Sequence, residues 1–174
     1  SIDLSDSILE LEDIGVDSDV RYDTGIGELN RVLGGGLVKG SLVLLGGEPG
    51  IGKSTILLQI CQVLGEGHSV LYVSGEESAE QIKMRATRIG IHNEECTVFT
   101  ETLLENIVAQ IEELRPDLVI IDSIQTISTD LVESSPGSVT QVRECAATLL
   151  KVAKSYGIAI FIIGHITKEG TIAG

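Results

Sequence analysis

Short runs of aliphatic residues alternate along this chain with longer segments in which apolar residues recur at helical spacing. Aliphatic runs between glycines or polar turns are typical of strands buried on both faces of a sheet. Aromatic residues make up only 3% of the chain, so valine, isoleucine, leucine and alanine must fill the core. The pattern predicts strands at residues 42–46, 70–73, 97–99, 118–122 and 158–164.

The segments between these runs have the apolar spacing of amphipathic helices. Two of them open with the spacing of an N-terminal capping box, Ser78 with Gln81 and Thr102 with Glu105. We therefore expect helices at residues 54–64, 78–89, 102–114 and 139–156.

Strands that alternate with helices predict an α/β fold, in which a mostly parallel sheet carries helices on both faces. Each crossover should be right-handed, and ligands should bind beyond the carboxyl ends of the strands. The length of 174 residues suits one domain, which we place at residues 21–174. The motifs described below follow the ends of predicted strands.

The amino-terminal stretch, residues 1–20, is strongly acidic and has no lysine or arginine. We interpret it as a solvated, weakly ordered lead-in. The formal net charge of −14 argues against broad electrostatic binding of nucleic acid. It leaves open a local basic loop or a channel formed by an oligomer. The acidic residues are Asp3, Asp6, Glu10, Glu12, Asp13, Asp17 and Asp19.

The three cysteines, Cys61, Cys96 and Cys145, are far apart and indicate neither a disulfide framework nor a zinc site. Each lies in an apolar periodic segment, so we expect buried free thiols. No signal peptide and no membrane-length apolar run is present. These features predict a cytoplasmic location, no membrane contact and no bound metal other than Mg²⁺.

Residues 47–54 match the phosphate-binding pattern G-x-x-x-x-G-K-[ST] between a predicted strand and a predicted helix. Glycines let backbone N–H groups approach phosphate oxygens, and the helix N-terminus adds positive partial charge. Lys53 would bind the β- and γ-phosphates of ATP, Ser54 would reach Mg²⁺, and Thr55 would contact the α-phosphate. The alternative is a glycine-rich turn with an exposed lysine. The nucleotide-binding residues predicted here are Gly47, Glu48, Pro49, Gly50, Ile51, Gly52, Lys53, Ser54 and Thr55.

Asp122 ends the aliphatic run at residues 118–122, where P-loop enzymes place a carboxylate that holds Mg²⁺. Its alternative role is to cap the following turn. Glu76 and Glu77 follow the run at residues 70–73. Adjacent side chains on an extended segment point in opposite directions, so only one of the two can face the γ-phosphate. We favour Glu76 as the catalytic base; the alternative is a solvated acidic turn.

His165 follows the last predicted strand, where a neutral ring could donate a hydrogen bond to the γ-phosphate. An ordinary surface histidine is an equally good interpretation. For adenine recognition, the basic residues of the helix at 78–89 are Lys83, Arg85 and Arg88. We favour Arg85, because guanidinium planes stack on bases, over the alternative of a solvated helix face.

Four segments together resemble the RecA-like ATPases, and most closely the RadA/Sms family of bacterial DNA-repair and recombination proteins. The resemblance implies a P-loop NTPase whose five predicted strands have the order 3-2-4-5-1. It also implies that Glu76 is the catalytic carboxylate, that His165 senses nucleotide, and that residues 128–138 form the first DNA-binding loop. A second such loop would open at Thr167. The matching segments are residues 21–38, 72–78, 119–125 and 164–170.

The resemblance further implies homo-hexameric rings that bind single-stranded DNA and promote branch migration. The four-cysteine zinc module, the Lys-Asn-Arg-Phe-Gly motif and the Lon-protease-like domain of that family have no counterpart here, and the sheet is truncated after its fifth strand. We therefore expect this segment alone to be weakly active.

The function expected on these grounds is that of a Mg²⁺-dependent ATPase motor acting on single-stranded DNA and branched recombination intermediates. One alternative is a KaiC-like or regulatory nucleotide switch that does not move DNA. A phosphotransferase is a third possibility, although the sequence shows no acceptor pocket or lid.

Overall fold

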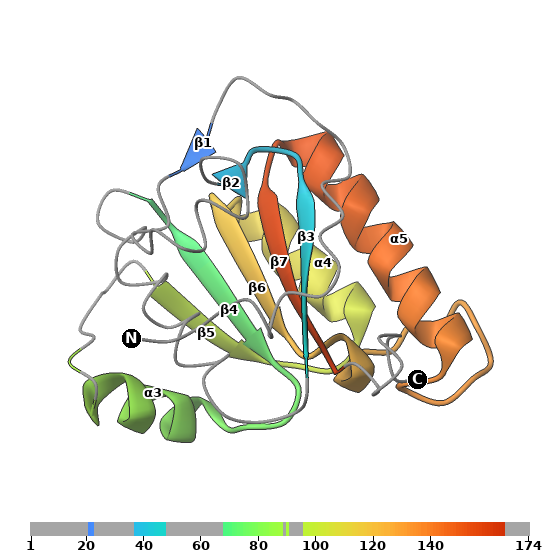
Figure 1. The fold of residues 1–174 in the computed structure, drawn as a ribbon, viewed down its shortest axis with the longest axis horizontal. Helices are drawn as coiled ribbons and strands as arrows, with labels where there is room; N and C mark the ends of the chain where they lie inside the picture. The colour runs from blue at the N-terminus through green and yellow to red at the C-terminus, as the bar shows by residue number, and fades with distance from the viewer. Residues whose placement is uncertain (1–20, 23–36, 48–67, 89, 91–95, 166–174) are drawn as a thin grey trace.

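A five-stranded parallel sheet forms the centre of the molecule (Figure 1). The computed structural model describes residues 21–22, 37–47, 68–88, 90 and 96–165. The strand order is β3-β7-β6-β4-β5, and every neighbouring pair is parallel. Numbered along the predicted strands, this is the expected order 3-2-4-5-1. The strands are β3 (Leu42–Gly47), β4 (Val70–Ser74), β5 (Cys96–Thr100), β6 (Leu118–Asp122) and β7 (Ala159–His165).

Two helices, α4 (Leu104–Leu114) and α5 (Val139–Tyr156), share one buried apolar cluster with one face of this sheet. Alternate residues of the central strands enter the cluster, such as Leu71 and Val73 of β4. The residues between them point to the opposite face, where Tyr72 and Ile120 are also buried. Both faces of the central strands are therefore shielded from water, as their aliphatic sequences predict.

The remaining described elements are short or lie around this core. Helix α3 (Ala79–Arg88) follows β4 and contacts β5, and a short 3₁₀ helix, η1 (Ile124–Thr126), follows β6. Strands β1 (Arg21–Tyr22) and β2 (Leu37–Val38) form a separate antiparallel pair. The helix predicted at residues 54–64 and the acidic stretch at 1–20 lie outside the described residues. In the part of the chain that is described, no helix is long and apolar enough to cross a bilayer.

One predicted helix start is confirmed and one is wrong. At α3, the Ser78 N–H donates to Gln81 Oε1 at 3.1 Å and the Gln81 N–H donates to Ser78 Oγ at 3.2 Å, as a capping box requires. At α4 the N-cap is Leu103, without a side-chain cap. Glu101 instead accepts hydrogen bonds from the Thr102 and Leu103 N–H groups at 3.0 and 3.1 Å.

The prediction of buried thiols is right for Cys145 and wrong for Cys96. Cys96 is half-buried, because β5 is the edge strand of the sheet and its side chains are only partly covered. Cys145 lies in the apolar cluster, and burial raises its pKa to about 11. Cys61 lies outside the described residues.

Candidate active site

Polar residues meet at the carboxyl edge of the sheet because parallel strands all end on the same side. Ser74 is the last residue of β4, and its register partner is Asp122, the last residue of β6. Further along the same edge, Gly47 at the end of β3 pairs with His165 at the end of β7. The backbone at the start of the phosphate-binding motif therefore reaches the same edge as Asp122.

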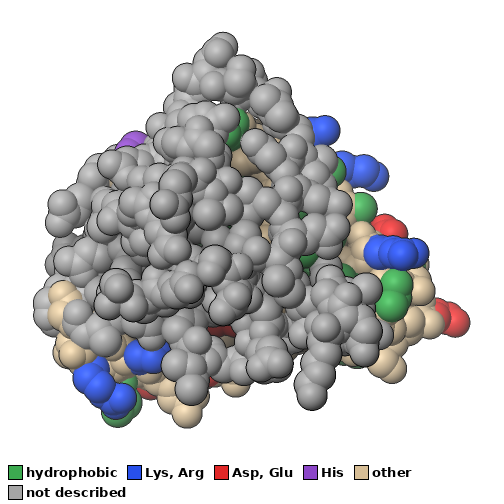
Figure 2. Space-filling view, viewed as in Figure 1, with side chains coloured by type: hydrophobic (Ala, Val, Ile, Leu, Met, Phe, Trp, Pro, Cys, Tyr) green, Lys and Arg blue, Asp and Glu red, His purple; other side chains and the backbone are tan. Residues whose placement is uncertain are grey.

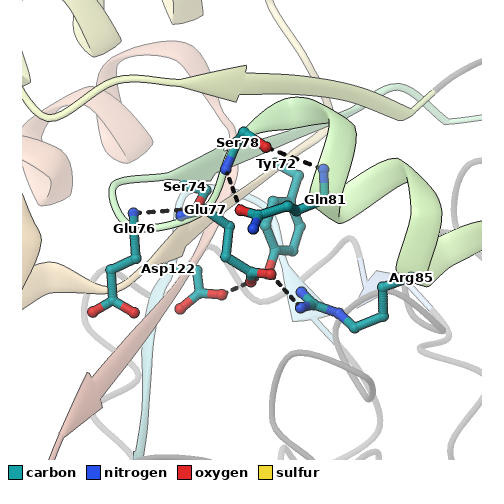
Figure 3. Close-up of polar contacts among 8 residues, drawn as sticks. All are labelled: Tyr72, Ser74, Glu76, Glu77, Ser78, Gln81, Arg85 and Asp122. Carbon is teal, nitrogen blue, oxygen red and sulfur yellow. Dashed lines mark hydrogen bonds and ion pairs between the residues drawn. The ribbon is translucent and has the colours of Figure 1, made fainter.

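The Asp122 carboxylate is mostly buried and accepts a hydrogen bond from a side chain of the neighbouring strand β4. Its Oδ2 accepts a hydrogen bond from the Tyr72 hydroxyl at 2.6 Å (Figure 3). Burial raises the pKa of Asp122, and the negative charges of Glu76 and Glu77 act in the same direction. The Tyr72 hydrogen bond and the charge of Arg85 oppose this shift without cancelling it. No capping hydrogen bond from Asp122 to the following turn is present among the described residues.

The turn after β4 is held close to the end of β6. Ser74 Oγ accepts hydrogen bonds from the backbone N–H groups of Glu76 and Glu77, at 3.3 and 3.0 Å. The Gly75 N–H donates to the Asp122 carbonyl at 3.0 Å. A Cβ atom at Gly75 would lie 2.1 Å from Thr126 Oγ1, so only glycine fits this approach. The turn thus carries both glutamates to the edge where Asp122 lies.

The two glutamates leave this turn in different directions (Figure 3). Glu77 Oε2 accepts a hydrogen bond from Arg85 Nη1 at 2.6 Å, and both side chains of this ion pair are partly buried. The Glu76 residue is exposed. The two side chains thus diverge, as neighbours on an extended segment do, and Glu77 has a charged partner on α3.

Arg85 is the basic residue of α3 that turns toward the site, whereas Lys83 and Arg88 are exposed. Burial opposes its charge, but the hydrogen bond and the charge of Glu77 outweigh this effect, so the pKa of Arg85 is raised. Its Nε and Nη2 atoms are buried and have no hydrogen-bond partner among the described residues. Arg85 therefore has donors left for a ligand, and contact with adenine stays a prediction.

Several predicted site residues cannot be placed. Residues 48–55, including Lys53, Ser54 and Thr55, lie outside the described residues, and His165 is described only by its backbone. Their roles stay predictions. Two neighbours of Asp122 were missed from the sequence, Tyr72 and Ser74. The signal that could have found them is the two-residue period of β4, which places both on one face of the strand.

The donor set fits Mg²⁺, because carboxylate and hydroxyl oxygens are the ligands that this hard cation prefers. Asp122 would supply the carboxylate, and the predicted Ser54 would supply a hydroxyl. No group of three or more histidine, cysteine or acidic residues in the described segments is arranged to hold a metal. Protein sites for Mg²⁺ typically use one or two carboxylates together with phosphates and water.

The loop at residues 128–138 is built around the buried side chain of Gln141, at the start of α5. The Gln141 Oε1 accepts from the Thr129 N–H at 2.9 Å, and Nε2 donates to the carbonyls of Thr129 and Ser134, each at 3.0 Å. The loop exposes Leu131, 73% accessible, beside Asp130. A fixed loop with an exposed apolar tip is suited to recognition, while its acidity is unfavourable for contact with phosphate.

Comparison with known proteins places these features in a family. Residues 6–171 match the model of the AAA domain family. The chain is 59% identical over 155 residues to DNA repair protein RadA of Bacillus subtilis, covering 88% of this chain and 34% of that protein. It is 56% identical over 154 residues to that of Streptococcus pneumoniae, with 88% and 37% covered. For Pseudomonas aeruginosa the identity is 52% over 164 residues, with 94% and 36% covered. The chain thus spans about a third of the length of these relatives.

Replacing Gly75 by alanine should lower the free energy of unfolding by about 1–3 kcal/mol, because the new methyl group overlaps Thr126. Urea unfolding followed by circular dichroism measures the loss. The double variant Gly75→Ala/Thr126→Gly removes the overlapping atoms and should recover part of it. Simple addition of the two single losses would contradict the close approach of this turn to η1.

Replacing Gln141 by leucine should also cost about 1–3 kcal/mol, because buried backbone groups of the loop lose their partner. Amide hydrogen exchange should become faster at residues 129–134. Gln110→Leu, the same change at a half-buried glutamine of α4, is the control. Equal exchange in both variants would show that Gln141 does not hold the loop.

Proposed function

Since this chain belongs to the AAA domain family, as the ATPase region of a RadA-type protein, we propose that it binds and hydrolyses ATP to drive DNA repair. The observation that supports this function best is the meeting of Asp122, the Glu76 turn and Gly47 at one edge of the sheet. A P-loop enzyme needs a phosphate-binding backbone, an acid for Mg²⁺ and a group that activates water, and in this proposal these neighbouring residues would supply them.

ATP binding is assigned to the motif at residues 47–54. Its backbone N–H groups would surround the phosphates, with Lys53 as the cation for the β- and γ-phosphates. Ser54 and Asp122 would hold Mg²⁺, which when bound neutralises charge on the phosphate oxygens. Arg85 has buried donors that would bind the nucleotide, and its pairing with Glu77 fixes its orientation.

Glu76 is the base in this proposal, and Glu77 is a positioning residue. A general base must be able to reach and deprotonate the attacking water, and such a group typically contributes about 10²–10⁴-fold to the rate. The Glu77 carboxylate is already engaged by Arg85 at 2.6 Å, so moving it to the water would break an ion pair. Glu76 follows the same turn, and its exposed side chain is directed away from Arg85 (Figure 3).

Coupling to DNA is assigned to the loops that follow β6 and β7. His165 ends β7 opposite Gly47, so a contact from its ring to the γ-phosphate would be transmitted to the loop that starts at Thr167. We infer that the assembled protein is a homo-hexamer acting on single-stranded DNA and branched recombination intermediates. The relatives are named DNA repair protein RadA, which supports a role in DNA repair. The resemblance to the RadA/Sms family supports the hexamer and the DNA substrates.

A second function, a nucleotide switch without DNA movement, is favoured by one observation. The loop at residues 128–138 carries Asp130 and Glu133 and no lysine or arginine. Phosphate release by the full-length protein should rise several-fold when single-stranded DNA is added if the motor function holds. Equal rates with and without DNA would favour the switch.

Glu76→Gln should lower the turnover number at least about 100-fold with little change in the affinity for ATP, because the base is lost while the shape is kept. Glu77→Gln should retain more turnover, since it weakens only the Arg85 pairing. Phosphate release and binding of a fluorescent ATP analogue measure the two effects in the full-length protein. Lys53→Ala, which should lose nucleotide affinity, is the control. Full turnover in Glu76→Gln would contradict the assignment.

A further inference from the structure

The Tyr72 side chain is fully buried next to the metal-binding acid and is used by none of the steps above. It lies on β4, with Ile120 as its register partner on β6, while Asp122 pairs with Ser74 two positions further along. Tyr72 and Asp122 are therefore diagonal neighbours on one face of a parallel pair, within reach of a long aromatic side chain. The tyrosine hydroxyl donates to Asp122 Oδ2 at 2.6 Å (Figure 3).

We propose that Tyr72 is a positioning residue for the metal site: its hydroxyl holds Oδ2 of Asp122 so that Oδ1 is presented to Mg²⁺. The inference rests on the proposed function, because it assumes that Asp122 serves Mg-ATP. A carboxylate at the end of a strand can rotate about its terminal torsion, which is broad and roughly two-fold. A donor fixed in the core removes this freedom on one side, as partners that hydrogen-bond a metal ligand do in other metal sites.

Packing alone does not account for a tyrosine at this position. Tyr72 has 0% relative exposure, and a phenylalanine would fill nearly the same volume without a hydroxyl that needs a partner. The strand residues around it are aliphatic, as its register partner Ile120 is. The hydroxyl is thus placed in an apolar layer, where it donates to Asp122, the one carboxylate of β6.

The charged groups near Tyr72 and Asp122 support the proposal that Tyr72 orients the Asp122 carboxylate. Arg85 lies close enough for its charge to act on Asp122 and on Tyr72, but its Nη1 is held by Glu77. Among the described residues no ion pair joins Arg85 to Asp122, and the Tyr72 hydroxyl is the donor to Oδ2 of Asp122. In Figure 2, lysine or arginine side chains are visible at the lower left of the molecule, where Figure 1 places α3, and much of the surface that faces the viewer belongs to residues outside the described ranges.

The test compares two tyrosine-to-phenylalanine variants of the full-length protein. Tyr72→Phe removes the hydroxyl beside Asp122, and Tyr156→Phe removes the hydroxyl that donates to Glu112 on the outside of α4. Mn²⁺ binding to the complex with a non-hydrolysable ATP analogue, followed by electron paramagnetic resonance, is the direct readout. Nucleotide affinity in EDTA and the Mg²⁺ dependence of turnover complete the comparison.

We expect Tyr72→Phe to weaken Mn²⁺ binding about tenfold or more, as loss of a partner of a metal ligand does elsewhere. Nucleotide affinity in EDTA should be unchanged, and turnover should recover at high Mg²⁺. Tyr156→Phe should match the wild type in every measurement. Wild-type Mn²⁺ affinity in Tyr72→Phe would overturn the proposal, and so would an equal loss of nucleotide affinity in EDTA.

The chain contains three tyrosines and no tryptophan, which allows a second measurement if Tyr72→Phe does not fold. Fluorotyrosine incorporation gives one fluorine resonance for each tyrosine of this region, assigned with Tyr22→Phe and Tyr156→Phe. The Tyr72 resonance should shift when Mg²⁺ joins the nucleotide complex, and an unmoved resonance overturns the proposal. If the wild type itself shows no metal-dependent nucleotide binding, the proposed function fails, and that failure is seen before any variant is compared.

Discussion

Burial of the Asp122 carboxylate at the end of an aliphatic strand is the constraint on which the rest of the site depends. A buried charge is costly unless hydrogen bonds or opposite charges compensate it, and here burial still raises the pKa of the group. The Tyr72 hydroxyl and the charge of Arg85 supply partial compensation. Glu77 orients Arg85, and Ser74 shapes the turn that carries Glu77. One acid thereby organises β4, β6 and α3 into a single polar cluster.

The fold could be predicted largely from the alternation of aliphatic runs and helical segments. Strands buried on both faces give the strongest pattern, so β4, β6 and β7 were found to within a residue or two. The RecA-like resemblance added the strand order, which short-range patterns do not contain. The capping box at Thr102 and the burial of Cys96 were predicted wrongly, because contacts outside the local sequence pattern determine both. The expected exchange of hydrogen bonds between Thr102 and Glu105 is replaced by bonds from the Thr102 and Leu103 N–H groups to Glu101, and the edge position of β5 exposes part of Cys96.

The site was only partly predictable, for a related reason. Asp122 and Glu76 could be proposed because each comes at the end of a predicted strand, and Arg85 because it is a basic residue on the helix that follows Glu76. The two-residue period of β4 places Tyr72 on one face with Ser74, but its contact with Asp122, 50 residues away in the chain, depends on the register between β4 and β6. The role of Gln141 was missed for a similar reason. Its partner Thr129 lies in the loop before α5, and a pattern along the helix does not indicate this contact. Long-range pairing determines these contacts, and a single sequence does not contain it.

A crystal structure of the full-length protein with Mg²⁺ and a non-hydrolysable ATP analogue tests the central claim most directly. The account predicts phosphates on the backbone of residues 47–54, Mg²⁺ beside Ser54 and linked to Asp122 directly or through one water, and Glu76 nearer the γ-phosphate than Glu77. A nucleotide bound away from the carboxyl edge of the sheet, or Mg²⁺ remote from Asp122, would contradict it.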